Sequence, residues 1–319
     1  MTSTALRRDT ALGALVDQAA ELYDGSYARI LEGRIHEGMD RLVVGLQQLR
    51  AAHEPEAWRG WAESAALQHP VVEMAQQDPF TYRAFAKPRG YPGDAGILDL
   101  IYGAVPLPLG TTDLGRQIYD YTRGAPACRS VRARRDLLAK EVDALADAVD
   151  RPHILSVACG HLREVQRCTA AGAGLLGGFY ALDQDEESLA LIDREHAALG
   201  VTTLRESVRG LVTGKVSLPP LDLAYAAGLY DYLALPVAIA VTRAMLAMVK
   251  PGGRVLVANF APNLRDIGYM ETVMAWNLIY RDETDMSAIV AGLPAAQVAG
   301  SRLFRDAYEN IVFLEVVKA

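Results

Sequence analysis

The chain has 319 residues, enough to bury one large core or two smaller ones. Hydrophobic residues make up 51% and charged residues 22%, which is typical of a soluble globular enzyme. The formal net charge of −7 argues against a nucleic-acid partner, because a protein that holds many phosphates needs a basic face.

The first 150 residues are predicted to be helical. Apolar residues recur at helical spacing within 12–23 and 35–49, and an amphipathic helix is predicted from about 131 to 149. Four arginines gather at the start of this last helix: Arg129, Arg132, Arg134 and Arg135. We interpret them as a solvated helix start rather than an anion site, because a cluster of like charges usually faces water.

A segment of different character, DPFTYRAFAKPRGYPGDAGILDLIYG (78–103), lies between these helices. Its Pro and Gly residues exclude one uninterrupted helix. Charge and aromatic rings on such a loop indicate either a lid over an active site or a structural loop held by an Arg–Asp pair. As a lid, it would let Arg89 clamp a carboxylate of the substrate or of a cofactor and would place Tyr91 nearest the cofactor. Tyr121 is a weaker candidate for substrate contact.

From residue 152 the pattern alternates between strands and helices. Strands are predicted at 153–158, 177–183, 201–207, 221–228 and 253–260, with helices at 162–173, 185–199 and 235–249. This alternation predicts an α/β fold with a doubly wound, mostly parallel sheet. The last two strands, 297–306 and 309–318, form an antiparallel hairpin. We expect a helical substrate-capping domain at 1–150 and a ligand-binding domain at 151–319.

Two stretches of the second half predict a nucleoside site. HILSVACGHLRE (153–164) is a strand that ends in a tight turn, and FYALDQD (179–185) is a strand that ends in an acid, Asp183. The turn brings backbone N–H groups to a ligand and the acid holds a ribose diol. Asp183 could instead cap the following helix, a role open to Asp185. The turn has one glycine, Gly160, which suits S-adenosylmethionine better than a pyrophosphate-containing cofactor.

On these motifs, with LDLAYAAGLYDYL, MVKPGGRVLV and the hairpin, residues 152–319 resemble the class I S-adenosylmethionine-dependent methyltransferases, which have a Rossmann-like fold. The resemblance implies a cofactor site with Ala158 and Gly160 at the methionine end, Asp183 at the ribose, Ser207 and Val208 at the adenine, and Ala226 and Gly228 beneath the sulfonium. Gln184 is a further predicted cofactor-binding residue. Ser156, Ala158 and Leu162 depart from the usual pattern.

A narrower resemblance covers nearly the whole chain. AFAKPRGYPGDAGILDLIYG, LSVACG, GLYDYL and AWNLIYRDETD are similar to a bacterial group that includes the methyltransferases making 3-hydroxy fatty acid methyl esters. It implies methyl transfer to an oxygen of a small, partly apolar acceptor. A carboxylate acceptor needs no base, whereas a hydroxyl would need one, supplied by His161 or Asp94. His161 could equally be an ordinary loop residue.

Trp276, Tyr280 and Arg281 are predicted to lie on one helix and to bind the substrate, with core packing as the alternative for Trp276. Other functions stay open: an N- or C-methyltransferase of a small secondary metabolite, a nicotinamide-dependent oxidoreductase, or a non-catalytic cofactor-binding regulatory protein.

Three cysteines match no metal-ligand spacing and suggest a reducing compartment, so we expect a cytoplasmic protein without a metal. No apolar stretch approaches the length of a membrane span. The sequence does not indicate an oligomeric state.

Overall fold

The computed structural model describes the backbone of residues 3–319 and the side chains from residue 12 onward. The chain divides into two compact units. The helical unit comprises the residues up to Arg129 together with Leu264–Asn277, and the sheet unit comprises Ser130–Asn263 and Leu278–Ala319. These bounds differ from the predicted division at 150/151, because most of the last N-terminal helix belongs with the sheet and a later segment belongs with the helices.

The helical unit is built from antiparallel helices and short helical turns. Its helices are α1 (Ser3–Leu31), α2 (Ile35–Ala52), α3 (Pro55–Ala62), α4 (Pro70–Ala75), α5 (Pro79–Ala86), α6 (Ala95–Tyr102), α7 (Asp113–Arg123) and α13 (Ile267–Thr272). Helix α13 lies against α2, where a Cβ on Gly268 would come within 2.5 Å of the Leu46 backbone. Arg50 and the Trp58 indole also bond to Glu271, each at 2.7 Å. The late segment is therefore a packed part of this unit.

A buried carboxylate organises the middle of the helical unit. Asp78 is fully buried before α5 and accepts hydrogen bonds from Phe80 N–H, Thr81 N–H and the hydroxyls of Thr81 and Thr122, at 2.7–3.2 Å. Burial raises the pKa of Asp78 to about 6, against the lowering effect of these four donors.

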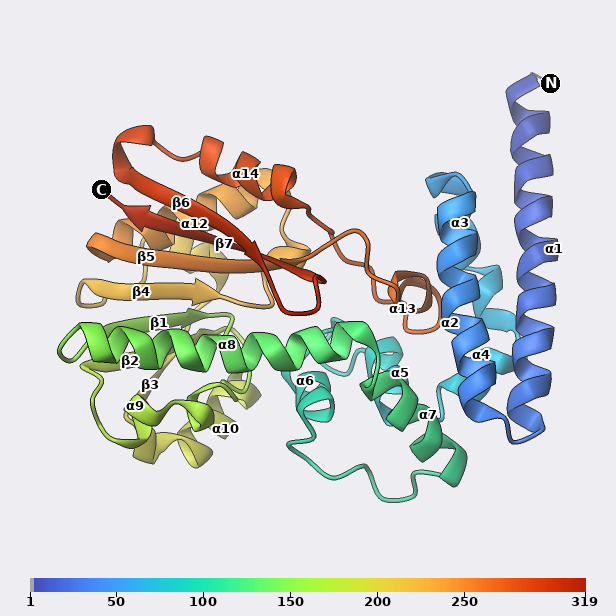
Figure 1. Cartoon of the computed structure of the whole chain (residues 1–319), viewed down its shortest axis with the longest axis horizontal. Coiled ribbons are helices and arrows are strands. Elements are labelled where there is room, and N and C mark those ends of the chain that lie inside the picture. Colours follow the sequence, from blue (N-terminus) through green and yellow to red (C-terminus); the bar gives the residue numbers. More distant parts are fainter. Residues whose placement is uncertain (1–2) are drawn as a thin grey trace. The chain divides into compact units, whose positions relative to one another are not determined.

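The sheet unit contains a seven-stranded sheet in the order β3-β2-β1-β4-β5-β7-β6 (Figure 1). The strands are β1 (His153–Val157), β2 (Gly178–Asp183), β3 (Val201–Arg205), β4 (Leu221–Ala226), β5 (Val249–Phe260), β6 (Val298–Arg305) and β7 (Ile311–Lys318). Strands β1 to β5 are parallel, and β7 pairs antiparallel with β5 and β6. The predicted fold class is confirmed. Strand β5 begins earlier than predicted, because Val249 already pairs with Leu221.

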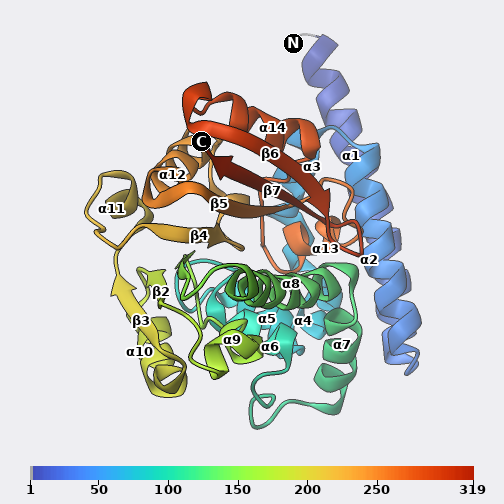
Figure 2. The same cartoon turned by 60° about the vertical axis from the view of Figure 1, so that its left-hand side comes forward.

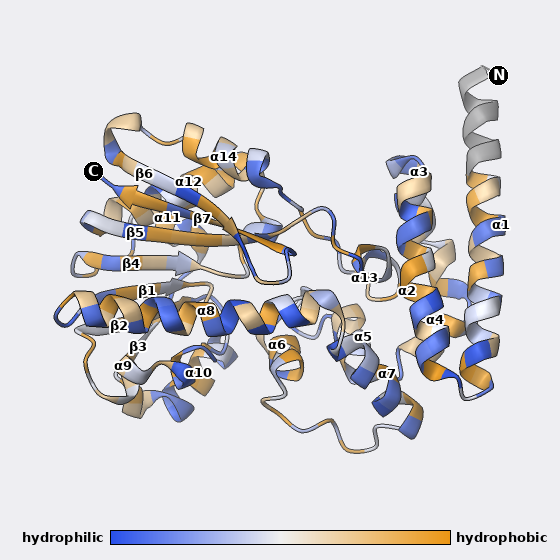
Figure 3. Ribbon diagram, viewed as in Figure 1, coloured by the Kyte–Doolittle hydropathy of each residue, from blue (hydrophilic) through white to orange (hydrophobic). Residues whose placement is uncertain are grey.

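Helices cover both faces of this sheet. They are α8 (Pro126–Ala148, in this unit from Ser130), α9 (Thr169–Gly172), α10 (Glu186–Glu195), α11 (Val208–Val212), α12 (Leu235–Met248) and α14 (Glu283–Ala291). Figure 2 shows α8, α9 and α10 on one side of the sheet and α12 and α14 on the other. The core between the layers is aliphatic, and β5 and β7 are apolar along most of their length (Figure 3).

The helix predicted at 162–173 is wrong. The chain there forms a 3₁₀ turn at Val165–Arg167 and the single turn α9. Leu162 has φ 49°, a left-handed conformation that an α-helix excludes, so no regular helix can start directly after the β1 turn.

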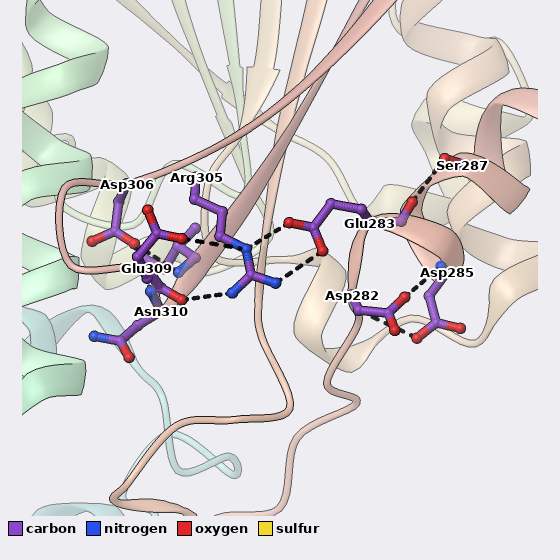
Figure 4. A network of polar contacts seen from close by, with 9 residues as sticks. Asp282, Glu283, Asp285, Ser287, Arg305, Asp306, Glu309 and Asn310 are labelled. Carbon is purple, nitrogen blue, oxygen red and sulfur yellow. Dashed lines mark hydrogen bonds and ion pairs between the residues drawn. The ribbon is translucent and has the colours of Figure 1, made fainter.

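The closing hairpin is tied to α14 by charged side chains (Figure 4). Arg305 of β6 donates two hydrogen bonds to the Glu283 carboxylate, at 2.5 and 2.8 Å. Asp282 and Asp285 form a reciprocal capping box at the start of α14. No helix in the described part of the chain is both long and apolar enough to cross a membrane.

Candidate functional site

The candidate site lies at the carboxyl ends of β1 to β4. The strand order runs from β1 to β2 and β3 on one side and from β1 to β4 and β5 on the other, so the topology reverses between β1 and β4. In open α/β sheets, ligands bind outside the carboxyl ends of the strands at such a reversal. All eight residues predicted to bind the cofactor follow or end these four strands.

The turn after β1 has a strained backbone. Ala158, Gly160 and Leu162 have φ values of 51°, 55° and 49°. The Cys159 N–H bonds to the Leu182 carbonyl of β2 at 3.1 Å, which fixes the turn against the neighbouring strand. Left-handed conformations cost alanine and leucine free energy, and such strain concentrates at functional sites.

Asp183 faces this turn from the end of β2. Its carboxylate accepts hydrogen bonds from Gly160 N–H at 2.8 Å and from Asp185 N–H at 2.9 Å. Because an ionised carboxylate has about four lone-pair positions, two such bonds leave acceptor capacity for a diol. Burial raises the pKa of Asp183, and the backbone N–H groups beside it oppose that rise. Helix capping is not its role, because Asp185 caps α10 by accepting from Glu187 N–H.

The other predicted cofactor residues lie on neighbouring strand ends. Glu206 N–H bonds to the Asp183 carbonyl, which places Ser207 and Val208 beside the end of β2. Ser207 caps α11 by accepting from Gly210 N–H. Gln184 is exposed, Ala226 is the buried last residue of β4, and Gly228 is exposed two residues later. These are the positions that the sequence predicted around one ligand.

Arg134 is a residue of this region that sequence reasoning missed. It was interpreted as part of a solvated helix start, but only 4% of its surface is exposed. Its Nη2 lies 3.7 Å from the place that a Cβ would take on Gly228, and its Cζ lies 6.0 Å from the centre of the Phe260 ring. The sequence shows four arginines close together but does not indicate which of them is buried.

Two buried carboxyl groups near Arg134 were also missed. Glu164 accepts a hydrogen bond from the Tyr225 hydroxyl at 2.7 Å, and Asp231 accepts one from Phe260 N–H at 2.7 Å. Burial raises the pKa of Glu164 and raises that of Asp231 to about 6, while Arg134 lowers both. Sequence patterns alone gave no signal for either.

The predicted catalytic residue His161 and the predicted substrate residue Arg281 both lie in the sheet unit. His161 is buried next to Gly160, and its carbonyl accepts from the His196 ring at 3.1 Å. Arg281 donates to the carbonyls of Tyr230 and Leu233 and to Asn259. Its guanidinium therefore joins the β5 end to the Tyr230–Tyr232 turn.

The helix predicted to carry Trp276, Tyr280 and Arg281 is wrong. The chain between α13 and α14 is irregular, and Ala275 has φ 47°, which turns the backbone out of a helix. The spacing of Trp276 and Tyr280 therefore does not put them on one helical face. Trp276 is buried in the helical unit, and its N–H bonds to the Met270 carbonyl.

The remaining candidates belong to the helical unit. Arg89 and Tyr91 lie half-buried in the irregular loop between α5 and α6, as the Pro and Gly residues predicted. The loop is stitched by an Arg–Asp pair, since Arg83 bonds to both oxygens of Asp94 at 2.8 Å. Asp94 also caps α6, so this acid is structural. The Tyr121 hydroxyl bonds to Asp40 at 3.2 Å. The functional roles of Arg89, Tyr91 and Tyr121 stay predictions.

Two other observations bear on the site. Among the described residues, no group of three or more His, Cys, Asp and Glu side chains is arranged to hold a metal ion. A hollow of about 660 Å³ is lined by residues such as Pro220, Val249 and Lys318, at the amino ends of β4 and β5. It therefore lies at the edge of the sheet opposite the candidate site.

No family model matches the chain, and no curated protein matches it. Among solved structures, the chain is similar to a possible exported protein from Bordetella parapertussis, with 17% identity, a TM-score of 0.58, and coverage of 100% of this chain and 99% of that one. This likeness extends to the fold of the whole chain.

Two further structures are similar over part of the chain. One is magnesium protoporphyrin IX methyltransferase from Synechocystis PCC 6803 with bound S-adenosylhomocysteine, at 12% identity, TM-score 0.47, covering 69% of this chain and 92% of that one. The other is the N-methyltransferase NodS from Bradyrhizobium japonicum WM9, at 12% identity, TM-score 0.41, covering 59% and 95%.

Proposed function

We propose that the protein is an S-adenosylmethionine-dependent methyltransferase that methylates an oxygen of a small, partly apolar acceptor. The observation that carries the proposal is the Asp183 carboxylate, held by Gly160 N–H at 2.8 Å with acceptor positions left over. A carboxylate in this setting suits the vicinal hydroxyls of a ribose. The turn and the acid come from adjacent strands, β1 and β2.

The local chain favours a nucleoside without phosphates. A pyrophosphate site needs the N-terminus of a regular helix and a glycine-rich turn. Here the turn has one glycine, and a 3₁₀ turn and the four-residue α9 follow it. A sulfonium nucleoside needs neither of these features. A nicotinamide cofactor contains a pyrophosphate and needs both, so the oxidoreductase is disfavoured.

Methyl transfer from a sulfonium requires few catalytic groups from the protein. The sulfonium is already a strong electrophile, so the site has to align the acceptor oxygen with the methyl group and exclude water. A carboxylate acceptor is ionised at neutral pH and needs no general base, which makes it the acceptor we favour. A hydroxyl acceptor would assign His161 the role of base. We place the reaction in the reducing cytoplasm, in keeping with the three free cysteines.

Calorimetry with S-adenosylhomocysteine tests the cofactor assignment. Asp183→Ala removes two charge-assisted hydrogen bonds to the ribose, which is expected to cost roughly 2–4 kcal/mol of binding free energy. The affinity should therefore fall by well over the tenfold that we take as the minimum effect. Asp193→Ala is the matched control, because this exposed aspartate of α10 bonds only to the Thr203 hydroxyl. Tight binding of NADH, or an unchanged affinity of Asp183→Ala, would contradict the proposal.

Turnover tests the catalytic part. The protein is incubated with S-adenosylmethionine and a panel of hydroxy fatty acids and other small acids, and methylated products are sought by mass spectrometry. An ester product supports oxygen methylation of a carboxylate. Cofactor binding without any methylated product, across acids, alcohols and amines, would favour the non-catalytic regulatory protein instead.

A further inference from the structure

The guanidinium of Arg134 lies over the carboxyl ends of the central strands. It extends from α8, is 96% buried, and reaches to 3.7 Å from the Cβ position of Gly228, the second residue after β4. Its Cζ lies 6.0 Å from the ring of Phe260, the last residue of β5. Apart from Gly228 itself and its two chain neighbours, no other heavy atom of the described residues comes within 4 Å of that Cβ position. The cation therefore borders open space beside β4, at the reversal of strand order.

The charge of Arg134 is not balanced by a direct partner. Throughout residues 12–319, no side chain or carbonyl accepts a hydrogen bond from its guanidinium or forms an ion pair with it. The carboxyl groups of Glu164 and Asp231 are near, but they accept from Tyr225 and from Phe260 N–H. A guanidinium has five N–H donors, and an anionic ligand beside Arg134 would supply acceptors for them. The arrangement lacks an acceptor.

We propose that Arg134 receives the carboxylate of a ligand bound at the reversal between β1 and β4. The planar N–H fork of arginine matches a carboxylate in two parallel hydrogen bonds, and burial strengthens them. The inference rests on the proposed function, which offers two possible origins for this carboxylate. One is the amino-acid end of the cofactor, and the other is the methyl acceptor. Arg134 thus repels the sulfonium itself and attracts only the anionic part of either ligand.

The first arm of the test compares S-adenosylhomocysteine with 5′-methylthioadenosine, which lacks the amino-acid end. If the cofactor supplies the carboxylate, Arg134→Met weakens S-adenosylhomocysteine binding about tenfold to a hundredfold and leaves 5′-methylthioadenosine binding within about twofold. Arg134→Lys keeps the charge and loses the fork, so its loss is smaller. Arg129→Met is the control, because Arg129 is exposed on the same helix.

The second arm titrates octanoate, a simple partly apolar carboxylate, into the S-adenosylhomocysteine complex. An octanoate affinity that depends on Arg134, with unchanged cofactor binding, assigns the carboxylate to the acceptor. The proposal is overturned if Arg134→Met and Arg134→Lys leave both arms unchanged. It is also overturned if both variants weaken S-adenosylhomocysteine and 5′-methylthioadenosine equally, since that is the result of a purely structural role. A wild-type protein that binds neither nucleoside refutes the proposed function itself, which is a different result.

Discussion

Each unit holds a buried aspartate beside a turn of the chain, Asp78 in the helical unit and Asp183 in the sheet unit. Asp78 accepts four hydrogen bonds, two from backbone N–H groups and two from threonine hydroxyls. Asp183 accepts from the backbone N–H groups of Gly160 and Asp185, with Gln184 N–H as a weaker third contact. Burial raises the pKa of each, so both are costly to keep ionised.

The difference separates structural from ligand-binding carboxylates. A carboxylate has about four lone-pair positions, so Asp78 is saturated by its own unit and Asp183 is not. The protein holds the Asp183 carboxylate in one orientation and leaves its outer face unbonded. Arg134 has the corresponding unfilled capacity on the donor side, because its guanidinium N–H groups have no acceptor within residues 12–319. Unfilled hydrogen-bonding capacity therefore distinguishes Asp183 from Asp78, although both carboxylates are buried.

The largest expected effect is on the saturated aspartate. Asp78→Ala leaves two buried N–H groups without their acceptor and removes a partner of the Thr81 and Thr122 hydroxyls, which keep their contacts with the Tyr269 hydroxyl and the Tyr119 carbonyl. We therefore expect a loss of about 3–5 kcal/mol in the free energy of unfolding. Chemical denaturation at pH 7.5 measures it. Asp113→Ala, an exposed position in the first turn of α7, is the control and should change stability by less than about 0.5 kcal/mol. A loss below about 1 kcal/mol for Asp78→Ala would contradict the structural role that we assign to Asp78 and not to Asp183.

A second comparison concerns two arginines that each bond to both oxygens of one carboxylate. Arg83 pairs with Asp94, whose side chain is 1% exposed, whereas Arg305 pairs with Glu283, which is 45% exposed. Arg83→Met strands a buried charge and should cost about 2 kcal/mol, since one partner of a buried pair is removed. Arg305→Met should cost less than about 1 kcal/mol because water replaces the partner. Equal losses in thermal unfolding would show that burial does not set the difference.

The pH dependence of S-adenosylhomocysteine binding sharpens the role of Asp183. The ionised carboxylate accepts the ribose hydroxyl bonds more strongly, so affinity is full above the pKa and falls as the pH drops through it. Burial raises that pKa above 3.8, so the decline begins at a higher pH than for an exposed aspartate. Below the pKa the affinity should fall by up to about tenfold per pH unit. Asp183→Asn should bind weakly with a flat profile; an unaltered profile in this variant assigns the titration to another group.

The smallest effect is expected in the turn that presents Gly160 to Asp183. Ala158 has φ 51°, so Ala158→Gly relieves left-handed strain and should raise stability by about 0.5 kcal/mol after the entropy cost of glycine. Ala173→Gly is the control, because Ala173 has φ −87° and the same change there should destabilise by about 0.5 kcal/mol or more. The free energy of unfolding is measured by chemical denaturation for both variants. Changes of opposite sign support backbone strain at Ala158, and changes of equal sign contradict it.

The strands and their order in the chain could be predicted from the sequence, because buried strands are short apolar runs between turn residues. The hairpin and the pairing of Gly160 with Asp183 followed from the same patterns, since adjacent parallel strands bring their carboxyl ends together. The helix at 162–173 could not be corrected from the sequence. Its apolar spacing fits a helix, whereas the chain there forms a 3₁₀ turn and the four-residue α9 after the left-handed Leu162.

Positions fixed by tertiary packing were not predictable. Four arginines within seven residues look alike in the sequence, and only the docking of α8 on the sheet turns Arg134 inward. The spacing of Trp276 and Tyr280 suggested one helical face, but the backbone at Ala275 makes that spacing meaningless. The late segment of the helical unit gave no signal, because a chain that returns to an earlier unit carries no local pattern.

That returning segment determines when the helical unit can be completed during synthesis. The Thr81 hydroxyl bonds to the Tyr269 hydroxyl across 188 residues, and Arg50 bonds to Glu271 across 221. Ribosomes add roughly 5–20 residues per second, so the first helices wait on the order of ten seconds or more for these partners. The sheet strands emerge in that interval, so the N-terminal half cannot mature first. Until then, newly made α2 leaves exposed the face that packs against α13 in the finished protein.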